Sequence, residues 1–322
     1  MKEPYSMSAS NEKEYFSRIH RAEDYIEAHL GSTLRLEEIA KVACFSPFHF
    51  HRIFTFINRE TLYQFILRLR LERAANLFSQ PVARSITEIA MNLGFGSAAS
   101  FARAFQGVFG MSASAFRKNC KIKSKDWKDL ESLGIYLAQQ INPQLSRKTF
   151  MKNVNDFIPK KPISHHIVDL PLRTFAYIRH VGPYAGDSAL FERLYGQLCQ
   201  WAGPNGYLEK PETEMLCIYH DNPDITKEDK LRISVGITVA PGTSVPPPFQ
   251  TMEIPQGKYV AAKFDIDASE YMNAWAWIMN EWMPQSGWQC DDRPCYEKSL
   301  NDPAQHPQHR HIIEICEPVK PL

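Results

Sequence analysis

Glu297 and a group of tryptophans near the C-terminus have the composition of a site for a lipophilic cation. Trp275, Trp282 and Trp288 lie on or just after one predicted helix, and five of the six tryptophans fall in the C-terminal half. Aromatic ring faces attract a cation, and a carboxylate beside them adds a full opposite charge. The ordinary alternative is that the tryptophans belong to the core, which we expect for Trp282, and that Glu297 is a surface residue. We interpret Glu297 as functional.

A second group of residues with chemical potential lies in FSPFHFHRIF, residues 45–54. On a helix of about 3.6 residues per turn, Phe50 and Phe54 share an apolar side. Phe48, His51 and Arg52 then face solvent together. Arginine and histidine can hydrogen-bond to guanine or phosphate, and an aromatic ring can lie against a thymine methyl group. This face favours DNA contact, and the alternative is a helical bundle with inert surface arginines.

The same pattern returns about fifty residues later. EIAKVACFSPFHFHRIF, residues 38–54, is repeated as EIAMNLGFGSAASFARAF, residues 88–105. Spaced apolar matches of this kind indicate one supersecondary unit used twice. In the second copy the exposed face would present Ser100 and Arg103. Two copies at this spacing count strongly against the helical-bundle alternative.

Each copy has the parts of a helix-turn-helix. The spacing predicts short helices over residues 36–42 and 86–92, each followed by a tight turn and a second helix. Gly94 stands where the chain must turn left-handed, and Cys44 takes that place in the first copy. Both second helices would therefore project in the same way from their units.

A helix predicted over residues 61–79 connects the two units. At 1.5 Å per residue it spans about 28 Å. Successive turns of one DNA groove lie about 34 Å apart, so a rigid helix of this length could hold two reading helices over adjacent major-groove segments. Two reading helices in one chain remove the need for a dimer, and we expect a monomer.

The C-terminal half also repeats itself. Residues 168–207 match residues 252–288, and the segments that follow also match, 215–223 with 294–303 and 232–240 with 311–319. Each unit reads as strand, helix, strand, strand. Two such units can pair into one sheet with both helices on one face, leaving a cleft at the pseudo-dyad where a ligand can bind. The first unit has Leu216-Cys217 where the second has Tyr296-Glu297. The fold therefore does not demand a carboxylate at that position.

The two halves of the chain differ in charge. Residues 1–161 hold 24 Lys and Arg against 15 Asp and Glu, whereas residues 162–322 hold 13 against 21. A basic half suits a polyanion such as DNA, and an acidic half would face away from it. We expect a multidomain chain: a DNA-binding domain over 1–119, a connector over 120–161 and a small-molecule-binding domain over 162–322.

Other chemistry has weaker support in the sequence. Seven cysteines without a CxxC pair indicate reduced thiols, and the absence of a signal peptide or a long apolar run predicts a cytoplasmic protein with no membrane contact. His306, His309 and His311 could ligate a metal, but no acidic residue or cysteine completes the set locally. We expect no metal and no cofactor.

A family resemblance enters with LEEIAKVACFSPFHFHRIF, LRLRLERAANLF and SITEIAMNLGFGSAASFARAFQGVFGMSASAFR, within residues 36–117. They resemble the DNA-binding domain of AraC/XylS-type transcription regulators, which implies that the first reading helix dominates base contact. Ala98 and Ala99 replace polar residues that some members carry, which argues against base contact by the second reading helix. The positions implied for DNA contact are Phe48, His51, Arg52, Ser100 and Arg103.

Residues 162–320 resemble the GyrI-like effector-binding domain through LPLRTFAYIRHVGPY, HDNPD, IPQGKY, EWMPQSGW and the YE before NDP. The resemblance implies binding of amphipathic, often cationic, small molecules, and a related subset hydrolyses electrophilic compounds with a glutamate and aromatic residues. FDIDASEY departs from the Gly-Pro-Tyr turn that the family often has. The predicted ligand-binding residues are Glu297, Tyr296, Trp275 and Tyr259.

The fold class expected is an all-α N-terminal domain with two helix-turn-helices and an α+β C-terminal domain of two strand-helix-strand-strand units. The function expected is a sequence-specific transcription regulator that binds double-stranded DNA and a hydrophobic or cationic effector. RNA polymerase is an expected partner, as for an activator, although the residues leave activation and repression open. We expect no enzyme activity. The alternatives are a hydrolase that uses Glu297, tethered to DNA, and a constitutive DNA binder whose C-terminal half contacts only proteins.

Overall fold

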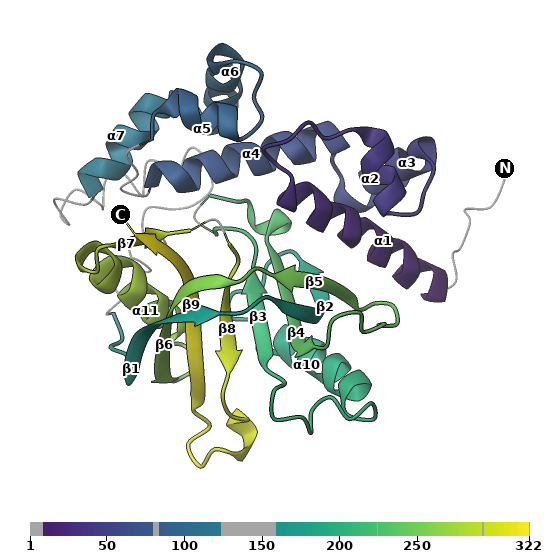
Figure 1. Ribbon diagram of the computed structural model, residues 1–322, viewed down its shortest axis with the longest axis vertical. Coiled ribbons are helices and arrows are strands. Elements are labelled where there is room, and N and C mark those ends of the chain that lie inside the picture. Colours follow the sequence, from purple (N-terminus) through teal and green to yellow (C-terminus); the bar gives the residue numbers. More distant parts are fainter. Residues whose placement is uncertain (1–8, 80–83, 124–158, 224, 292, 322) are drawn as a thin grey trace.

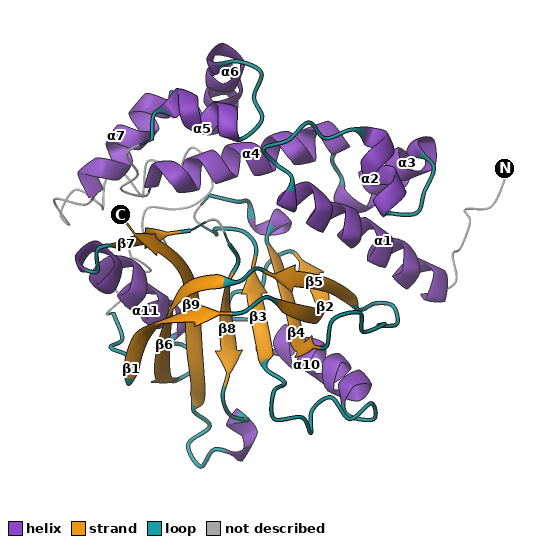
Figure 2. Cartoon of the chain, viewed as in Figure 1, coloured by secondary structure: helices purple, strands orange, loops and turns teal. Residues whose placement is uncertain are grey.

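A helical part packs across one end of a large antiparallel sheet in the computed structural model of the chain (Figure 1). The sheet carries its own helices on one face (Figure 2). This arrangement confirms the predicted fold class. The structure describes residues 9–79, 84–123, 159–223, 225–291 and 293–321, so the predicted connector over 120–161 lies almost wholly outside the described residues.

The helical part consists of two helix-turn-helices joined by a long helix, preceded by a further N-terminal helix. Its helices are α1 (Ala9–Ala28), α2 (Leu36–Val42), α3 (Pro47–Asn58), α4 (Leu62–Ser79), α5 (Ile86–Asn92), α6 (Ala98–Phe109) and α7 (Ala113–Lys123). The predicted helices agree with α2, α4 and α5 to within a residue. The N-terminal helix α1 was not predicted, although its buried residues Ile19, Ala22 and Ile26 have helical spacing.

Local capping fixes where these helices begin. The Ser85 hydroxyl accepts a hydrogen bond from the Glu88 backbone N–H at 3.0 Å, as the capping-box spacing requires. The two turns also have the predicted left-handed residue, with φ of 54° at Cys44 and 77° at Gly94. Both units therefore turn in the same way, and the prediction for their turns is confirmed.

Helix α4 contributes to two separate cores. Leu62, Phe65 and Leu69 pack with α1, α2 and α3, whereas Ala74 and Phe78 pack with α5, α6 and α7. One continuous helix thus fixes the position of each reading helix relative to the other.

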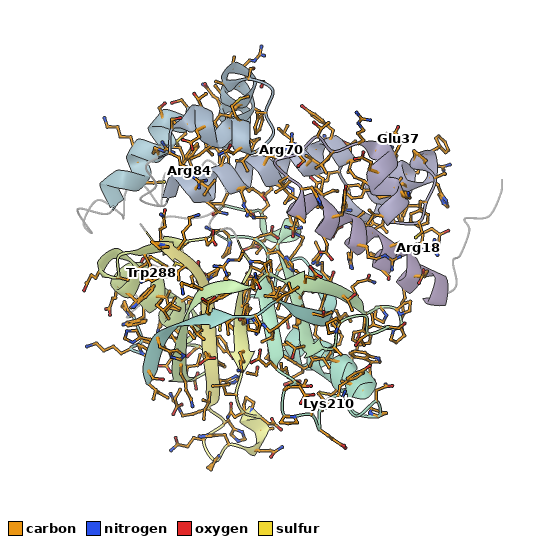
Figure 3. All side chains as sticks on the ribbon, in the orientation of Figure 1. Arg18, Glu37, Arg70, Arg84, Lys210 and Trp288 are labelled. Atoms are coloured by element: carbon orange, nitrogen blue, oxygen red, sulfur yellow. The ribbon has the colours of Figure 1, made fainter. Side chains whose placement is uncertain are left out.

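Arg70 of α4 lies between the two units and connects them (Figure 3). Its guanidinium donates to the carbonyl oxygens of Leu30 at 2.9 Å, Ser32 at 2.9 Å and Gly94 at 3.0 Å. Because Gly94 has no side chain, the guanidinium can lie directly against the turn; a Cβ atom there would come within 2.6 Å of Nη2. The glycine is therefore required by packing as well as by φ.

The C-terminal part is one antiparallel sheet with helices on one face. Its strands are β1 (Ser164–Leu170), β2 (Arg173–Val181), β3 (Met215–Tyr219), β4 (Arg232–Val239), β5 (Gln250–Ile254), β6 (Gly257–Ile266), β7 (Trp288–Cys290), β8 (Cys295–Ser299) and β9 (His311–Pro321). The order is β1-β6-β9-β8-β3-β4-β2-β5, and β7 pairs with β9. Its helices are α10 (Ser188–Ala202) and α11 (Tyr271–Ala276), which continues as a π-helical turn, Trp277–Trp282.

The predicted repeat is present as β2-α10-β3-β4 and β6-α11-β8-β9. Each unit also has a leading strand that sequence reasoning missed. These strands are exchanged, since β1 pairs with β6 of the second unit and β5 pairs with β2 of the first. The units meet at the centre of the sheet, where β3 pairs with β8 and Cys217 lies opposite Glu297.

The two faces of the sheet bury different residues. On the helix face, α10 packs on Ile178 and Val235, and α11 packs on Ile315. On the opposite face, Tyr177 and Tyr259 belong to a separate aromatic core. Successive residues of a strand point to opposite faces, so this division decides which side chains can share a site.

A candidate ligand site and a candidate DNA interface

Glu297 is a buried carboxylate on the helix face of the sheet. Its side chain belongs to β8, and the residue is 6% exposed. The Trp275 indole donates from Nε1 to Oε1 at 2.6 Å, and the Tyr219 hydroxyl donates to Oε2 at 2.8 Å. Both carboxylate oxygens thus have a donor from an aromatic side chain, one from a helix and one from a neighbouring strand.

Burial dominates the electrostatics of this carboxyl group. Desolvation raises the pKa of Glu297 to about 7, and the hydrogen bonds from Trp275 and Tyr219 lower it only in part. Among the residues that the structure describes, no cationic side chain contributes to this pKa shift. Since an unpaired buried carboxylate is costly, a ligand cation would supply the missing opposite charge.

Further aromatic residues gather around Glu297. The ring of Tyr219 lies 5.7 Å from that of Tyr184 and 6.2 Å from that of Trp275. Burial raises the pKa of the Tyr184, Tyr195 and Tyr271 hydroxyls, and the Glu297 charge adds to the shift in each. These four tyrosines and Trp275 are all half-buried. We call Tyr184, Tyr195, Tyr219, Tyr271 and Trp275 the aromatic group.

Sequence reasoning found only Trp275 of the aromatic group. A signal for Tyr219 was present, because it lies two residues after Cys217 and therefore on the same face of β3. Tyr195 directly follows Leu194 and lies about one turn before Leu198, at the edge of the buried side of α10. Tyr184 and Tyr271 end the motifs LPLRTFAYIRHVGPY and FDIDASEY, but sequence reasoning did not assign either of them to the site.

The other two predicted ligand residues lie elsewhere. Tyr296 and Tyr259 are fully buried on the opposite face of the sheet, with ring centroids 5.6 Å apart. The guanidinium of Arg173 covers the Tyr296 ring at 5.0 Å, and that of Arg293 covers the Tyr259 ring at 4.6 Å. Because Tyr296 precedes Glu297 in one strand, it points away from the carboxylate. The four residues do not form one site, and this part of the prediction is corrected.

The remaining sequence candidates have structural contacts. Trp282 and Trp288 pack partly buried against the core beneath α11. His306 Nδ1 accepts from the backbone N–H groups of Gln308 and Arg310, both at 3.3 Å. His311 Nδ1 contacts the Tyr271 hydroxyl at 2.9 Å. Within the described ranges, no cluster of three or more His, Cys, Asp or Glu side chains is arranged to hold a metal ion.

Helix α3 presents the predicted DNA-reading face. Phe48 is 76% exposed, and His51 and Arg52 are exposed beside it. The Arg52 guanidinium lies 5.8 Å from the centre of the Phe48 ring, so the two side chains support each other. Helix α3 lies on the part of the helical region that is turned away from the sheet (Figure 1).

Helix α6 presents a smaller exposed polar face than α3. Arg103 is exposed, but the Ser100 hydroxyl is half-buried and donates to the Ser97 carbonyl at 2.7 Å. Ser97 also caps the helix by accepting from the Ser100 backbone N–H at 3.1 Å. The Ser100 side chain is therefore already hydrogen-bonded at the start of α6, whereas the Arg103 side chain is exposed to solvent.

Known proteins resemble the two parts separately. A model of the GyrI-like small molecule binding domain matches residues 164–320, and a model of a helix-turn-helix domain matches residues 39–119. A DNA gyrase inhibitor of Yersinia enterocolitica is 30% identical over 141 residues, 42% of this chain and 85% of that protein. The Msm operon regulatory protein of Streptococcus mutans is 33% identical over 111 residues, 34% of this chain and 38% of that protein.

A crystal structure of an AraC-type transcriptional regulator from Chromobacterium violaceum is 25% identical, covers 32% of this chain and 91% of its own, and has a TM-score of 0.31. The chain belongs to the GyrI-like family and carries an AraC-type helix-turn-helix domain. Both predicted resemblances are confirmed. The AraC-type domain contains α3 and α6, and the GyrI-like domain contains Glu297 and the whole aromatic group.

The chain thus combines a helix-turn-helix DNA-binding domain with a small-molecule-binding domain. This confirms the function predicted at the level of its two domains. None of the described helices combines the length and the apolar character that a bilayer-spanning segment needs.

Proposed function

We propose that the GyrI-like domain is a sensor for a lipophilic cation, which binds against Glu297 among the aromatic group, and that occupancy changes DNA binding by the AraC-type domain. The observation that carries the proposal is a buried carboxyl group surrounded by half-buried aromatic rings, to which no cationic side chain of the described part of the chain contributes a charge. A delocalised cation with phenyl groups satisfies both the charge and the apolar surface.

DNA contact is assigned to Phe48, His51 and Arg52, with Arg103 and Ser100 in a lesser role. Exposure and the Phe48–Arg52 contact support the first helix, and the capping of Ser100 argues for the difference between the helices. RNA polymerase is the protein partner we infer for such a regulator. A cytoplasmic location and a monomeric chain complete the proposal.

Ligand binding without turnover is the function we favour. Trp275 and Tyr219 occupy both oxygens of Glu297, which suits holding a charge better than activating a water molecule. The hydrolase alternative has one observation in its favour: a carboxyl pKa of about 7 also suits a general base.

The test is a titration of the full chain with tetraphenylphosphonium, followed by tryptophan fluorescence. We expect saturable quenching in the wild type and much weaker binding in Glu297→Gln. Glu317→Gln is the matched control, since Glu317 is another buried carboxyl in the same domain with its pKa raised by burial to about 7. Binding that is equal in Glu297→Gln and wild type would refute the site.

Incubation with a panel of labile esters, followed by mass spectrometry, tests the hydrolase alternative. We expect no product from the wild type. Product that disappears in Glu297→Gln and persists in Glu317→Gln would replace the sensor with an enzyme.

A further inference from the structure

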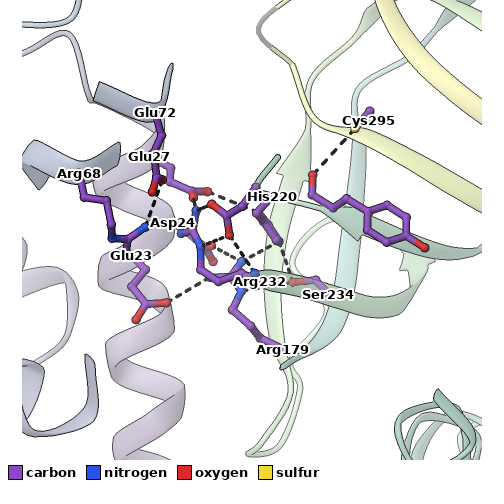
Figure 4. A network of polar contacts seen from close by, with 12 residues as sticks. Glu23, Asp24, Glu27, Arg68, Glu72, Arg179, His220, Arg232, Ser234 and Cys295 are labelled. Carbon is purple, nitrogen blue, oxygen red and sulfur yellow. Dashed lines mark hydrogen bonds and ion pairs between the residues drawn. The ribbon is translucent and has the colours of Figure 1, made fainter. Parts of the chain in front are cut away.

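The AraC-type domain is joined to the sheet by a buried network of charged side chains (Figure 4). Arg179 of β2 and Arg232 of β4 have side chains that are 0% and 3% exposed. Arg179 Nη2 lies 2.6 Å from Asp24 Oδ1, and its Nη1 lies 3.5 Å from Glu23 Oε2. Arg232 pairs with Glu27. All three carboxylates belong to α1, so one helix of the DNA-binding domain is clamped by two arginines of the sheet.

His220 lies in the middle of this network. Its Nδ1 is 3.4 Å from Glu27 Oε2, and its Nε2 is 3.2 Å from Arg179 Nη2 and 2.9 Å from Ser234 Oγ. Burial and the Arg179 charge lower the pKa of His220 despite the opposing effect of Glu27, which favours the neutral ring. A neutral ring that faces a carboxylate through Nδ1 and an arginine N–H through Nε2 carries its proton on Nδ1. His220 thus bridges α1 and β2.

The chain after His220 continues along the DNA-binding domain. Asn222 Nδ2 donates to Asn76 Oδ1 of α4 at 2.9 Å. Lys230 Nζ donates to the Asn58 carbonyl at the end of α3 at 2.5 Å and lies 3.4 Å from Glu60 Oε1. The described residues of the β3–β4 segment, 220–223 and 225–231, therefore contact α1, the second half of α4 and the end of the first reading helix.

The residue before His220 belongs to the ligand site. Tyr219 points to the helix face of the sheet, where its hydroxyl donates to Glu297 at 2.8 Å. His220 points to the opposite face, toward α1, because successive strand residues alternate. The carboxylate of the ligand site and the charge network of the domain interface are thus connected through two consecutive residues.

We propose that the end of β3 transmits ligand occupancy to the DNA-binding domain, through Tyr219 on one face and His220 on the other. The proposal rests on the sensor function for the identity of its ligand. A cation bound against Glu297 competes with the Tyr219 hydroxyl for the carboxylate. If Tyr219 is displaced, His220 moves with it, because the two residues are consecutive in the chain. A buried charge that loses its partner is costly. The ion pairs between the two arginines and α1 therefore change by a shift in population between two paired conformations, and not by gradual lengthening.

Hydrogen exchange of the α1 amides in the full chain tests this link without any ligand. Tyr219→Phe keeps the ring and removes only the hydroxyl that donates to Glu297. We expect it to speed exchange in α1 roughly two- to tenfold, the effect of losing about one buried hydrogen bond. Tyr259→Phe is the matched control, because it removes a hydroxyl that donates to the Pro255 carbonyl at 3.3 Å on the other face of the same sheet. We expect it to leave α1 unchanged.

Glu27→Gln shows that the measurement detects the network, since it alters the clamp directly. Faster exchange in Glu27→Gln with wild-type exchange in Tyr219→Phe would overturn the proposal. Equal acceleration by Tyr219→Phe and Tyr259→Phe would also overturn it, because the effect would then be general loosening of the sheet.

Tetraphenylphosphonium added to the same samples separates this inference from the sensor function. We expect it to change α1 exchange in the wild type and not in Tyr219→Phe. Absence of tryptophan quenching by this cation would count against the sensor, whereas the ligand-free comparison still decides the link between Tyr219 and α1.

Discussion

The Trp275 indole N–H donates to Glu297 at 2.6 Å and joins α11 to the carboxylate of β8. This bond stabilises the charged form of Glu297 against the burial that raises its pKa to about 7. The helix and the strand are thereby linked at this carboxylate. If Glu297 binds the proposed cation, substitutions at either residue should change both cation affinity and its dependence on pH.

Trp275→Phe should weaken cation binding. The substitution removes the donor to Oε1 and replaces the best cation–π ring with a poorer one, so we expect tetraphenylphosphonium affinity to fall roughly tenfold at pH 8. Calorimetric titration measures it without relying on the removed indole. Trp282→Phe is the control, since Trp282 packs in the core beneath α11. Similar losses in both variants would contradict a specific role for Trp275.

Cation affinity should rise with pH through about 7. Below its pKa Glu297 is neutral and offers no charge, and above it the carboxylate pairs with the cation. Affinity should therefore increase about tenfold per pH unit up to pH 7 and level off above it. Titrations between pH 5 and 9 measure the profile, and Glu297→Gln should flatten it. An affinity that is constant or falls with pH in the wild type would exclude Glu297 as the counter-charge.

Gly94→Ala should destabilise the AraC-type domain. At φ 77° an alanine is strained, and its Cβ would lie 2.6 Å from Arg70 Nη2, which must then give up a carbonyl. We expect a loss of about 2–4 kcal/mol in the free energy of unfolding, measured by denaturation followed by circular dichroism. Gly107→Ala is the control, because Gly107 lies within α6 with no atom near the added Cβ and should gain about 1 kcal/mol. An unchanged free energy of unfolding in Gly94→Ala would show that the contact between Arg70 and the Gly94 turn does not stabilise the domain.

Arg52→Ala should weaken DNA binding more than Arg103→Ala. If Arg52 contacts a base, the loss of binding free energy should be about 1–3 kcal/mol and confined to the preferred sequence. If it contacts phosphate, binding to all sequences should weaken, and the slope of log affinity against log salt concentration should fall in magnitude by about one. Fluorescence anisotropy at several salt concentrations separates these cases. Arg193→Ala, an exposed arginine on α10, is the control. Unchanged affinity in Arg52→Ala would show that α3 is not the main reading helix.

The helical part could be predicted from sequence because its determinants are local. The capping spacing of Ser85 and Glu88, the left-handed turns at Cys44 and Gly94, and the apolar spacing of α4 all act within a few residues. The repeat made each determinant visible twice.

The site could be predicted only in part because sheet geometry is not local. Glu297 and Trp275 were found, but adjacency in sequence placed Tyr296 beside Glu297, whereas strand alternation sends it to the other face. The interface was missed entirely. Nothing in the sequence near Asp24 or Glu27 indicates that Arg179 and Arg232, some 150–200 positions later, would neutralise them in the interior.

The central claim is that cation occupancy at Glu297 changes DNA affinity. The most direct measurement is the dissociation constant for a duplex selected from a random library by this protein, with and without saturating tetraphenylphosphonium. We predict a shift of roughly five- to one-hundredfold in the wild type and none in Glu297→Gln, while Glu317→Gln shifts like the wild type. An identical constant with and without the cation, in protein whose tryptophan quenching shows the site to be filled, would contradict the account.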